Sequence, residues 1–171
     1  EVIKEVLKEI PIEKVVETLN STFLTQGPMV PKFEKNFADY SGAKYGVTTN
    51  SATSALHVAC MALDLGKGDW LWTSPNSFVA SANCGIYCGA NVDFVDIDSK
   101  TYNICASALE VKLKKAEIEG KLPKIVIPVH YAGQSSEMKK IFDLSIKYGF
   151  KIFEDASHAA GAEYKKKNWL L

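Results

Sequence analysis

Short apolar segments alternate with helix-forming segments from residue 45 onward, and this alternation limits the possible fold more than any other feature of the sequence. Strands are predicted at 45–49, 70–73, 92–95, 124–129 and 150–153. Helices are predicted at 51–65, 77–88, 107–119 and 135–148, with Ser107 as a capping residue. Such alternation is typical of an α/β fold, with three αβα layers built around a mainly parallel sheet.

The segment before this repeat is also mostly helical. Apolar residues recur at helical spacing over 1–19, with an interruption at Pro11, and again over 31–40. Between them lies a loop at 22–31 that contains Gly27 and two prolines.

Composition excludes several classes of function. The chain has 171 residues with 20 basic and 20 acidic side chains, so no excess charge indicates a nucleic-acid partner. No apolar run is long enough to span a membrane, and we expect a soluble, cytoplasmic protein. The four cysteines lack zinc-like spacing to any histidine, so we interpret them as small buried thiols and predict no metal site.

Ligands of parallel sheets lie at the carboxyl ends of the strands, so the residues that follow each strand are the candidates for chemistry. After the first strand, residues 50–55 open a helix with small and hydroxylated side chains. Free amides at a helix N-terminus favour an anion such as phosphate, although an ordinary helix cap has the same pattern. After the second strand, Phe78 could stack on a planar ring, but taken alone this residue is typical of a core position.

The fourth and fifth strands are followed by further polar residues. His130 comes after the fourth strand, where it could either contact a ligand or stabilise a turn. Asp155 comes after the fifth strand, with His158 three residues later. A buried carboxylate needs a cationic partner, such as a protonated pyridine nitrogen. The alternative is a helix cap beside a core histidine. Taken together, the phosphate cradle, the aromatic ring and the carboxylate predict pyridoxal phosphate as the cofactor.

The sequence resembles the DegT-type family of sugar-nucleotide aminotransferases, which have the aspartate aminotransferase-like fold type I. The resemblance covers roughly residues 12 to 166 and rests on motifs that occur in order. These motifs are residues 25–28, 50–57, 75–80, 128–133 and 154–159. Within the family, the chain looks most like transaminases of pseudaminic acid synthesis, which aminate C4 of a UDP-linked 4-keto-6-deoxy-N-acetylhexosamine.

The resemblance implies roles for individual residues. Ala52 and Thr53 would hold the cofactor phosphate, Phe78 would stack on the pyridine ring, and Asp155 would pair with the ring nitrogen. His158 would lie near the 3-oxygen of the ring. His130 and Gly27 would lie on the side of the sugar nucleotide. Glutamate would donate the amino group, and two subunits would build each site.

The resemblance also implies the organisation of the chain. Residues 1–30 would form an N-terminal helix and a substrate-side loop, and 31–171 would form the first part of the cofactor-binding large domain. The family sheet has the strand order 3-2-4-5-6-7-1, so strands 3, 2, 4 and 5 of this chain would pair as one block.

The Schiff-base lysine of the family lies in a later segment that this sequence does not contain. Of the late lysines, Lys165, Lys166 and Lys167 resemble a surface turn. We therefore expect an incomplete aminotransferase that is inactive alone. One alternative is a non-catalytic remnant that binds pyridoxal phosphate or a partner subunit at most. Another is a small nucleotide-binding module of flavodoxin or Rossmann type, against which the missing glycine fingerprint counts.

Overall fold

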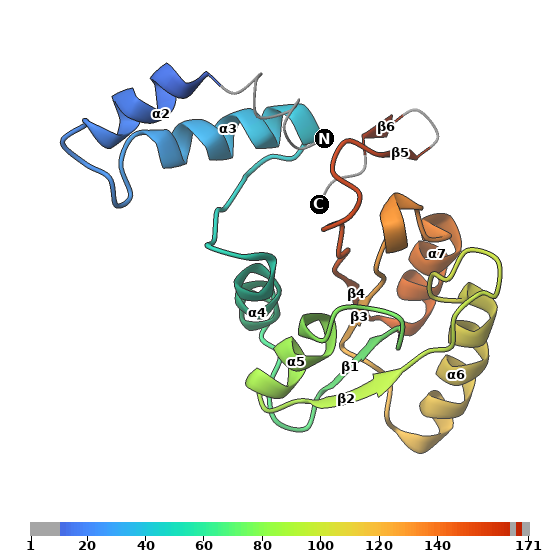
Figure 1. The fold of residues 1–171 in the computed structure, drawn as a ribbon. Coiled ribbons are helices and arrows are strands. Elements are labelled where there is room, and N and C mark those ends of the chain that lie inside the picture. Colours follow the sequence, from blue (N-terminus) through green and yellow to red (C-terminus); the bar gives the residue numbers. More distant parts are fainter. Residues whose placement is uncertain (1–10, 165–166, 169–171) are drawn as a thin grey trace. The chain divides into compact units, whose positions relative to one another are not determined.

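The chain divides into two compact units, Glu1–Thr48 and Thr49–Leu171. The computed structural model describes residues 11–164, 167 and 168 (Figure 1). Each unit is described below by itself. The assignment of 1–30 and 31–171 to separate parts of a larger enzyme stays a prediction.

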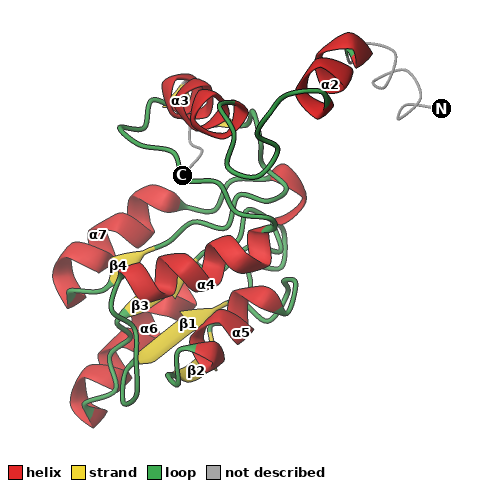
Figure 2. Cartoon of the chain, turned by 90° about the vertical axis from the view of Figure 1, so that its left-hand side faces the viewer, coloured by secondary structure: helices red, strands yellow, loops and turns green. Residues whose placement is uncertain are grey.

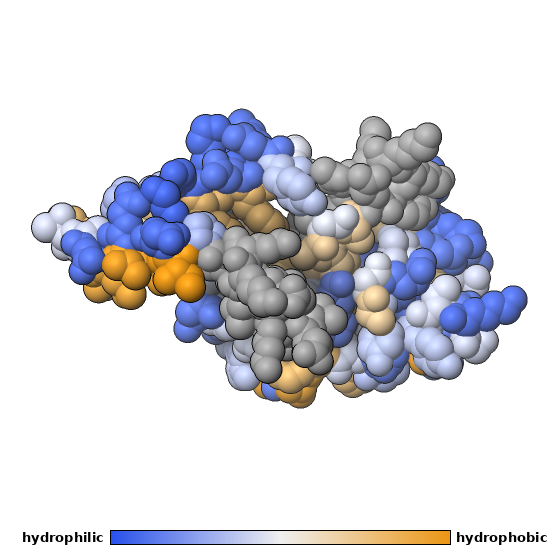
Figure 3. All heavy atoms as spheres, turned by 45° about the horizontal axis from the view of Figure 1, so that its top comes forward, coloured by the Kyte–Doolittle hydropathy of each residue, from blue (hydrophilic) through white to orange (hydrophobic). Residues whose placement is uncertain are grey.

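The first unit contains two helices, α2 (Ile12–Leu19) and α3 (Met29–Ser41). Helix α2 begins directly after Pro11, the point at which the sequence predicts an interruption, and the part of that prediction over 1–10 lies outside the described residues. None of the α2 residues is buried, and the apolar side chains of this helix are exposed on the surface. Figure 3 shows orange, apolar surface at the left, over this unit.

The predicted strand at 45–49 is wrong for the described chain. This segment forms neither a helix nor a strand, and it pairs with no strand among the described residues. It is held instead by α3, where Oε1 of Glu34 accepts hydrogen bonds from the Thr48 amide at 2.8 Å and the Thr48 hydroxyl at 2.7 Å. A strand needs a neighbour for its backbone groups. The family strand order would give this segment strand seven as its neighbour, and the described residues include no such strand.

The second unit follows the predicted alternation. Helices are α4 (Ala52–Ala62), α5 (Ala80–Tyr87), α6 (Ala106–Glu119) and α7 (Met138–Tyr148), with a short 3-10 helix, η1 (Tyr131–Gly133). Strands are β1 (Trp70–Thr73), β2 (Asn91–Phe94), β3 (Ile125–Ile127), β4 (Lys151–Ile152), β5 (Glu163–Tyr164) and β6 (Lys167–Asn168).

One predicted helix start is corrected by the structure. Cys105, rather than Ser107, is the N-cap of α6, and Ser107 lies inside the first turn. The chain stays extended up to this point, because Ile104 forms an isolated antiparallel bridge with Ile97 and the Cys105 amide donates to the Asp96 carbonyl at 2.9 Å.

The main sheet has the order β2-β1-β3-β4, and all its strands are parallel. In the numbering of the predicted strands this order is 3-2-4-5, so the block predicted from the family resemblance is confirmed. Thr73 on the central strand β1 pairs with Phe94 on one side and with Ile127 on the other. The carboxyl ends of β1 and β3 therefore lie next to each other. Strands β5 and β6 form a separate antiparallel pair.

Helices cover both faces of the sheet, which confirms the three-layer prediction (Figure 2). The side chains of β1 and β3 alternate between the faces, as the pleat of a strand requires. Leu71 and Ile125 pack with α4 and α5, whereas Trp72 and Val126 pack with α6 and α7. Both strands are largely buried on both faces, which explains why β3 is apolar throughout and β1 is apolar up to Thr73. Among the described residues, no helix is both long and apolar enough to cross a membrane.

Candidate functional site

Asp155 lies at the carboxyl end of the sheet, just beyond β4. Its backbone continues the ladder between β3 and β4, because its amide donates to the Pro128 carbonyl at 2.9 Å and its carbonyl accepts from the His130 amide at 3.1 Å. An isolated parallel bridge between Val129 and Asp155 marks this extension. These two bonds to the β3 extension fix the direction in which the Asp155 side chain leaves the chain.

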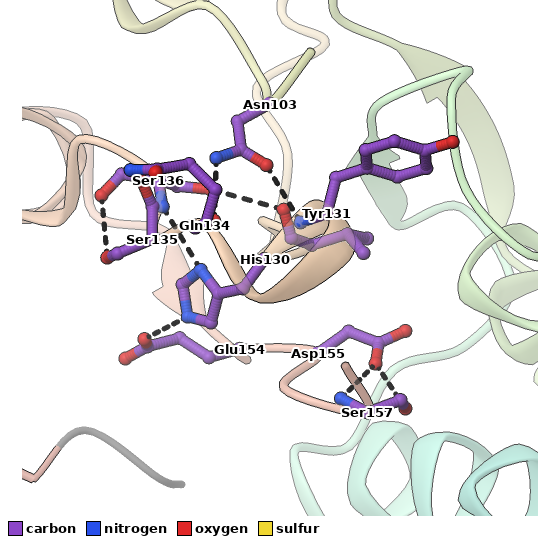
Figure 4. A network of polar contacts seen from close by, with 10 residues as sticks. Asn103, His130, Tyr131, Gln134, Ser135, Ser136, Glu154, Asp155 and Ser157 are labelled. Atoms are coloured by element: carbon purple, nitrogen blue, oxygen red, sulfur yellow. Dashed lines mark hydrogen bonds and ion pairs between the residues drawn. The ribbon is translucent and has the colours of Figure 1, made fainter. Parts of the chain in front are cut away.

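The Asp155 carboxylate is buried, with 8% of the residue exposed. Oδ2 accepts a hydrogen bond from the Ser81 hydroxyl at 2.9 Å, and Oδ1 accepts from the hydroxyl and the amide of Ser157 at 2.6 and 3.2 Å. Figure 4 shows the bonds with Ser157. All these donors are neutral, and no described cationic side chain forms an ion pair with Asp155. A buried carboxylate without a cation is suited to a cationic ligand atom.

A cavity of about 250 Å³ opens beside this carboxylate. All five residues predicted to bind the cofactor line it, although they come from distant parts of the sequence. The lining residues are Ala52, Thr53, Leu56, Ser77, Phe78, Ala80, Val129, Tyr131, Asp155, Ser157 and His158. The lining is mostly apolar with a few polar groups, which is typical of a small-molecule site.

The N-terminus of α4 forms one wall of the cavity. Ser51 is the N-cap, and its hydroxyl accepts a hydrogen bond from the Ser54 amide at 3.2 Å. The amides of Ala52 and Thr53 precede the first intrahelical bond, which the Ala55 amide donates to the Ser51 carbonyl. These two amides and the helix dipole provide the charge and the donors that an anion requires.

Phe78 lies at the rim of the cavity, with 73% of the residue exposed. Taken alone, its sequence position favoured a core residue, and that interpretation is wrong. The chain turns at Phe78 into α5, and the Phe78 carbonyl accepts a hydrogen bond from the Ser81 amide at 3.1 Å. An exposed aromatic ring beside a cavity is available for stacking on a planar ligand.

His158 lines the cavity with a defined arrangement of its ring nitrogens. Nδ1 accepts a hydrogen bond from the Ala132 amide at 3.4 Å, so the ring hydrogen of the neutral form lies on Nε2. The ring also makes an edge contact with Tyr131, with 6.3 Å between the centroids. Nε2 can therefore donate to an oxygen atom of a ligand.

His130 is buried and does not line the cavity, in contrast to its neighbours Val129 and Tyr131. Its Nδ1 accepts a hydrogen bond from the Ser136 amide at 3.2 Å, so the hydrogen of the neutral ring lies on Nε2. Nε2 donates this hydrogen to Oε2 of Glu154, at a distance of 2.8 Å (Figure 4). Both ring nitrogens are thus used inside the chain. Of the two roles left open by the sequence, this arrangement supports the role in a turn, and a substrate would have to break these bonds to reach the ring.

Gly27 belongs to the first unit, so its position relative to the cavity is not defined. A Cβ atom at this residue would lie 2.0 Å from the Phe23 carbonyl oxygen, so the turn itself requires glycine. The predicted substrate-side role of Gly27 stays a prediction.

Three polar residues near the carboxylate had no role predicted from the sequence. Ser157 and Tyr131 line the cavity, whereas Ser81 is buried behind the carboxylate and does not line it. Tyr131 is fixed by Asn103, whose Oδ1 accepts from the Tyr131 amide at 2.8 Å and whose Nδ2 donates to the Gln134 carbonyl at 2.8 Å. The available signals were the positions of Tyr131 and Ser157 directly after strand ends. Ser81 gives no such signal, because it lies inside a helix.

Among the residues that the structure describes, no lysine lines the cavity. Lys167 lies in β6, and Lys165 and Lys166 lie outside the described residues. The prediction that these lysines form a surface turn is therefore not tested by the structure.

Comparison with known proteins gives a consistent result. A sequence model of the DegT/DnrJ/EryC1/StrS aminotransferase family matches residues 6–169. The spore coat polysaccharide biosynthesis protein SpsC of Bacillus subtilis is 42% identical over 156 residues, which are 91% of this chain and 39% of SpsC. GDP-perosamine synthase of Caulobacter vibrioides is 36% identical over 154 residues, which are 90% of this chain and 40% of that protein. The chain thus spans about two fifths of the length of these relatives.

Solved structures are similar over the same part. The aminotransferase PseC of Helicobacter pylori, involved in the biosynthesis of pseudoaminic acid, superposes with a TM-score of 0.81 at 34% identity and covers 91% of this chain and 41% of PseC. The PLP-form of the putative sugar aminotransferase Spr1654 of Streptococcus pneumoniae has a TM-score of 0.80 at 27% identity, over 92% of this chain and 42% of Spr1654.

Proposed function

Since this chain belongs to the DegT/DnrJ/EryC1/StrS aminotransferase family, we propose that it forms the cofactor-binding part of a sugar aminotransferase. Enzymes of this family depend on pyridoxal phosphate. The observation that carries the proposal is the single cavity that joins the N-terminus of α4, the exposed ring of Phe78 and the buried carboxylate of Asp155. These groups match the phosphate, the ring face and the ring nitrogen of that cofactor.

The residues of the chain would divide the work of binding. The amides of Ala52 and Thr53, with the Thr53 hydroxyl, would hold the phosphate, and Phe78 would cover one face of the ring. Asp155 would hold a proton on the ring nitrogen, since a buried carboxylate and a cation stabilise each other. His158 would donate from Nε2 to the 3-oxygen of the ring. When bound, pyridoxal phosphate supplies an electron sink and a carrier for the amino group.

For the substrate, we propose a UDP-linked 4-keto-6-deoxy amino sugar, with glutamate as the amino donor and surface-glycan or flagellin-sugar synthesis as the context. The likeness to PseC, involved in the biosynthesis of pseudoaminic acid, supports this choice. A homodimer in the cytoplasm belongs to the same proposal.

A second candidate is a chain that binds pyridoxal phosphate without catalysing transamination, and the described residues that line the cavity include no lysine. Sodium borohydride tests whether the 171-residue chain is catalytic by itself. Reduction of the 171-residue chain after addition of pyridoxal phosphate should give no stoichiometric lysyl adduct if the reactive lysine lies elsewhere. A single adduct accompanied by turnover would show that this chain is catalytic alone.

Binding is the direct test of the proposed site. Titration of the chain with pyridoxamine 5′-phosphate, followed by ligand fluorescence, should give saturable binding that Asp155→Ala weakens strongly. Asp143→Asn is the control, because Asp143 lies on the exposed surface of α7 and pairs with Lys139. Equal affinity of the Asp155→Ala variant and the unsubstituted chain would contradict the ring-nitrogen assignment.

A further inference from the structure

Ser81 lies in the first turn of α5 and is completely buried, with 0% of the residue exposed. Its hydroxyl donates to Oδ2 of Asp155 at 2.9 Å, across 74 residues of sequence. The two bonds from Ser157 reach the other carboxylate oxygen, Oδ1. Ser81 is therefore the described residue that holds Oδ2.

The hydrogen bonds around Ser81 have a defined direction. A serine hydroxyl has one hydrogen, and that of Ser81 is used on Asp155. The hydroxyls of Ser77 and Ser81 are 2.7 Å apart, so Ser77 is the donor in this pair. Because Ser77 lines the cavity, a short chain of hydroxyls leads from the cavity wall to the back of the carboxylate. Each bond in such a chain polarises the next and strengthens it.

The carboxylate itself shows which oxygen a ligand would use. An ionised carboxylate has about four lone-pair positions, two on each oxygen. Ser157 fills both positions of Oδ1, and Ser81 fills one of Oδ2. The remaining position is on Oδ2, the oxygen that Ser81 orients.

We infer that Ser81 is a positioning residue for Asp155, and that it directs Oδ2 at the ring nitrogen of the cofactor. This inference rests on the proposed function. The turn that leads into α5 begins at Phe78, whose carbonyl accepts a hydrogen bond from the Ser81 amide at 3.1 Å. One helical turn thus sets the ring-stacking residue and the acceptor of the ring nitrogen together.

The test compares two ligands that differ at one ring atom. One is pyridoxamine 5′-phosphate, and the other is its 1-deaza analogue, in which a C–H group replaces the ring nitrogen. Ser81→Ala in the 171-residue chain should weaken binding of pyridoxamine 5′-phosphate about tenfold and change binding of the analogue less than about twofold, since only the first ligand has a ring nitrogen that can bond to the carboxylate that Ser81 orients. Ser81→Thr retains the hydroxyl and should restore most of the affinity.

The control is Ser145→Ala, which removes another buried serine hydroxyl, one that donates to the Phe142 carbonyl on α7. It should leave both affinities unchanged. Equal weakening of both ligands by Ser81→Ala would reduce Ser81 to a packing residue and overturn the inference. If Asp155→Ala weakens binding and Ser81→Ala does not, the inference fails and the proposed function stands. If the unsubstituted chain binds neither ligand, both fail.

Discussion

The buried His130 and the partly buried Glu154 form a pair, with Nε2 of the histidine 2.8 Å from Oε2 of the glutamate. The pair connects the residue after the β3 extension to the residue before Asp155, and it lies outside the cavity lining. It therefore supports the site from behind instead of contacting a ligand.

We expect Glu154→Ala to lower the free energy of unfolding by about 1–3 kcal/mol, because it leaves a buried imidazole N–H without an acceptor. Urea denaturation measures this change. Asp143→Asn is the control and should change stability by less than about 0.5 kcal/mol, since its ion pair with Lys139 is exposed. A loss of ligand affinity at unchanged stability would show instead that His130 contacts the ligand.

Phe78→Ala should weaken binding of pyridoxamine 5′-phosphate by roughly 1–3 kcal/mol, because the stacking of its ring is lost. Thr53→Ala should have a similar effect, because the hydroxyl that would bond to the phosphate is lost. Because Phe78 is exposed, the thermal midpoint of the Phe78→Ala variant should stay close to that of the unsubstituted chain. Ile86→Ala, an exposed change on the same helix α5, serves as the control. A large drop in the thermal midpoint would indicate that Phe78 packs in a core after all.

Hydrogen exchange should separate the sheet from the segment before it. The amides of Ile125–Ile127 lie in a strand paired on both sides and buried on both faces, so they should be strongly protected in the 171-residue chain. The amides of residues 45–49 should exchange quickly, apart from Thr48, which donates to Glu34. Amide exchange followed by NMR measures both. Equal protection of the two segments would mean that 45–49 joins a sheet in solution.

Asp69 ties the turn after α4 to the start of β3. Its Oδ2 accepts from Nζ of Lys124 at 2.8 Å and from the Gly66 amide at 2.9 Å. The hydrogen bond from Lys124 is the main reason why the pKa of the Asp69 carboxyl group is lowered. Since the pKa in the folded chain is below the unfolded value of about 3.9, this stabilisation is fully present above that pH.

The stabilisation by the Asp69 carboxylate is lost as the pH falls through the lower pKa that this group has in the folded chain. Asp69→Asn should therefore have a lower urea midpoint than the unsubstituted chain at pH 7, and the gap should close below pH ~4. Urea midpoints measured from pH 7 to pH 2 test this sign. A gap that stays constant over the whole range would show that the charge of Asp69 contributes nothing.

The sequence predicted those features that depend on local pattern. The alternation of strands and helices and the apolar β3 are visible in the residue types, because strands buried on both faces must be apolar. The order of the strands needed the family resemblance, since periodicity does not encode which strands become neighbours.

The residues of the candidate site also fall into those that local sequence predicts and those that depend on tertiary contacts. Asp155 and His158 could be predicted because they follow a strand end. The burial of His130 could not, because it depends on Glu154 and Ser136 closing around the ring. The exposure of Phe78 depends on the turn into α5, and the role of Ser81 depends on a contact 74 residues away in the sequence.

The chain carries two acids side by side, and the extended backbone turns one toward His130 and the other toward the cavity. Which acid points which way depends only on whether its position is odd or even along the strand, and that parity is set by the bonds of the Asp155 backbone to Pro128 and His130. A one-residue insertion in β4 would keep both acids, yet it would move Glu154 into the place of Asp155 and bring Phe153 to the place that faces His130. The imidazole would then lose its carboxylate partner, and the longer carboxylate would reach too far into a space sized for Asp155.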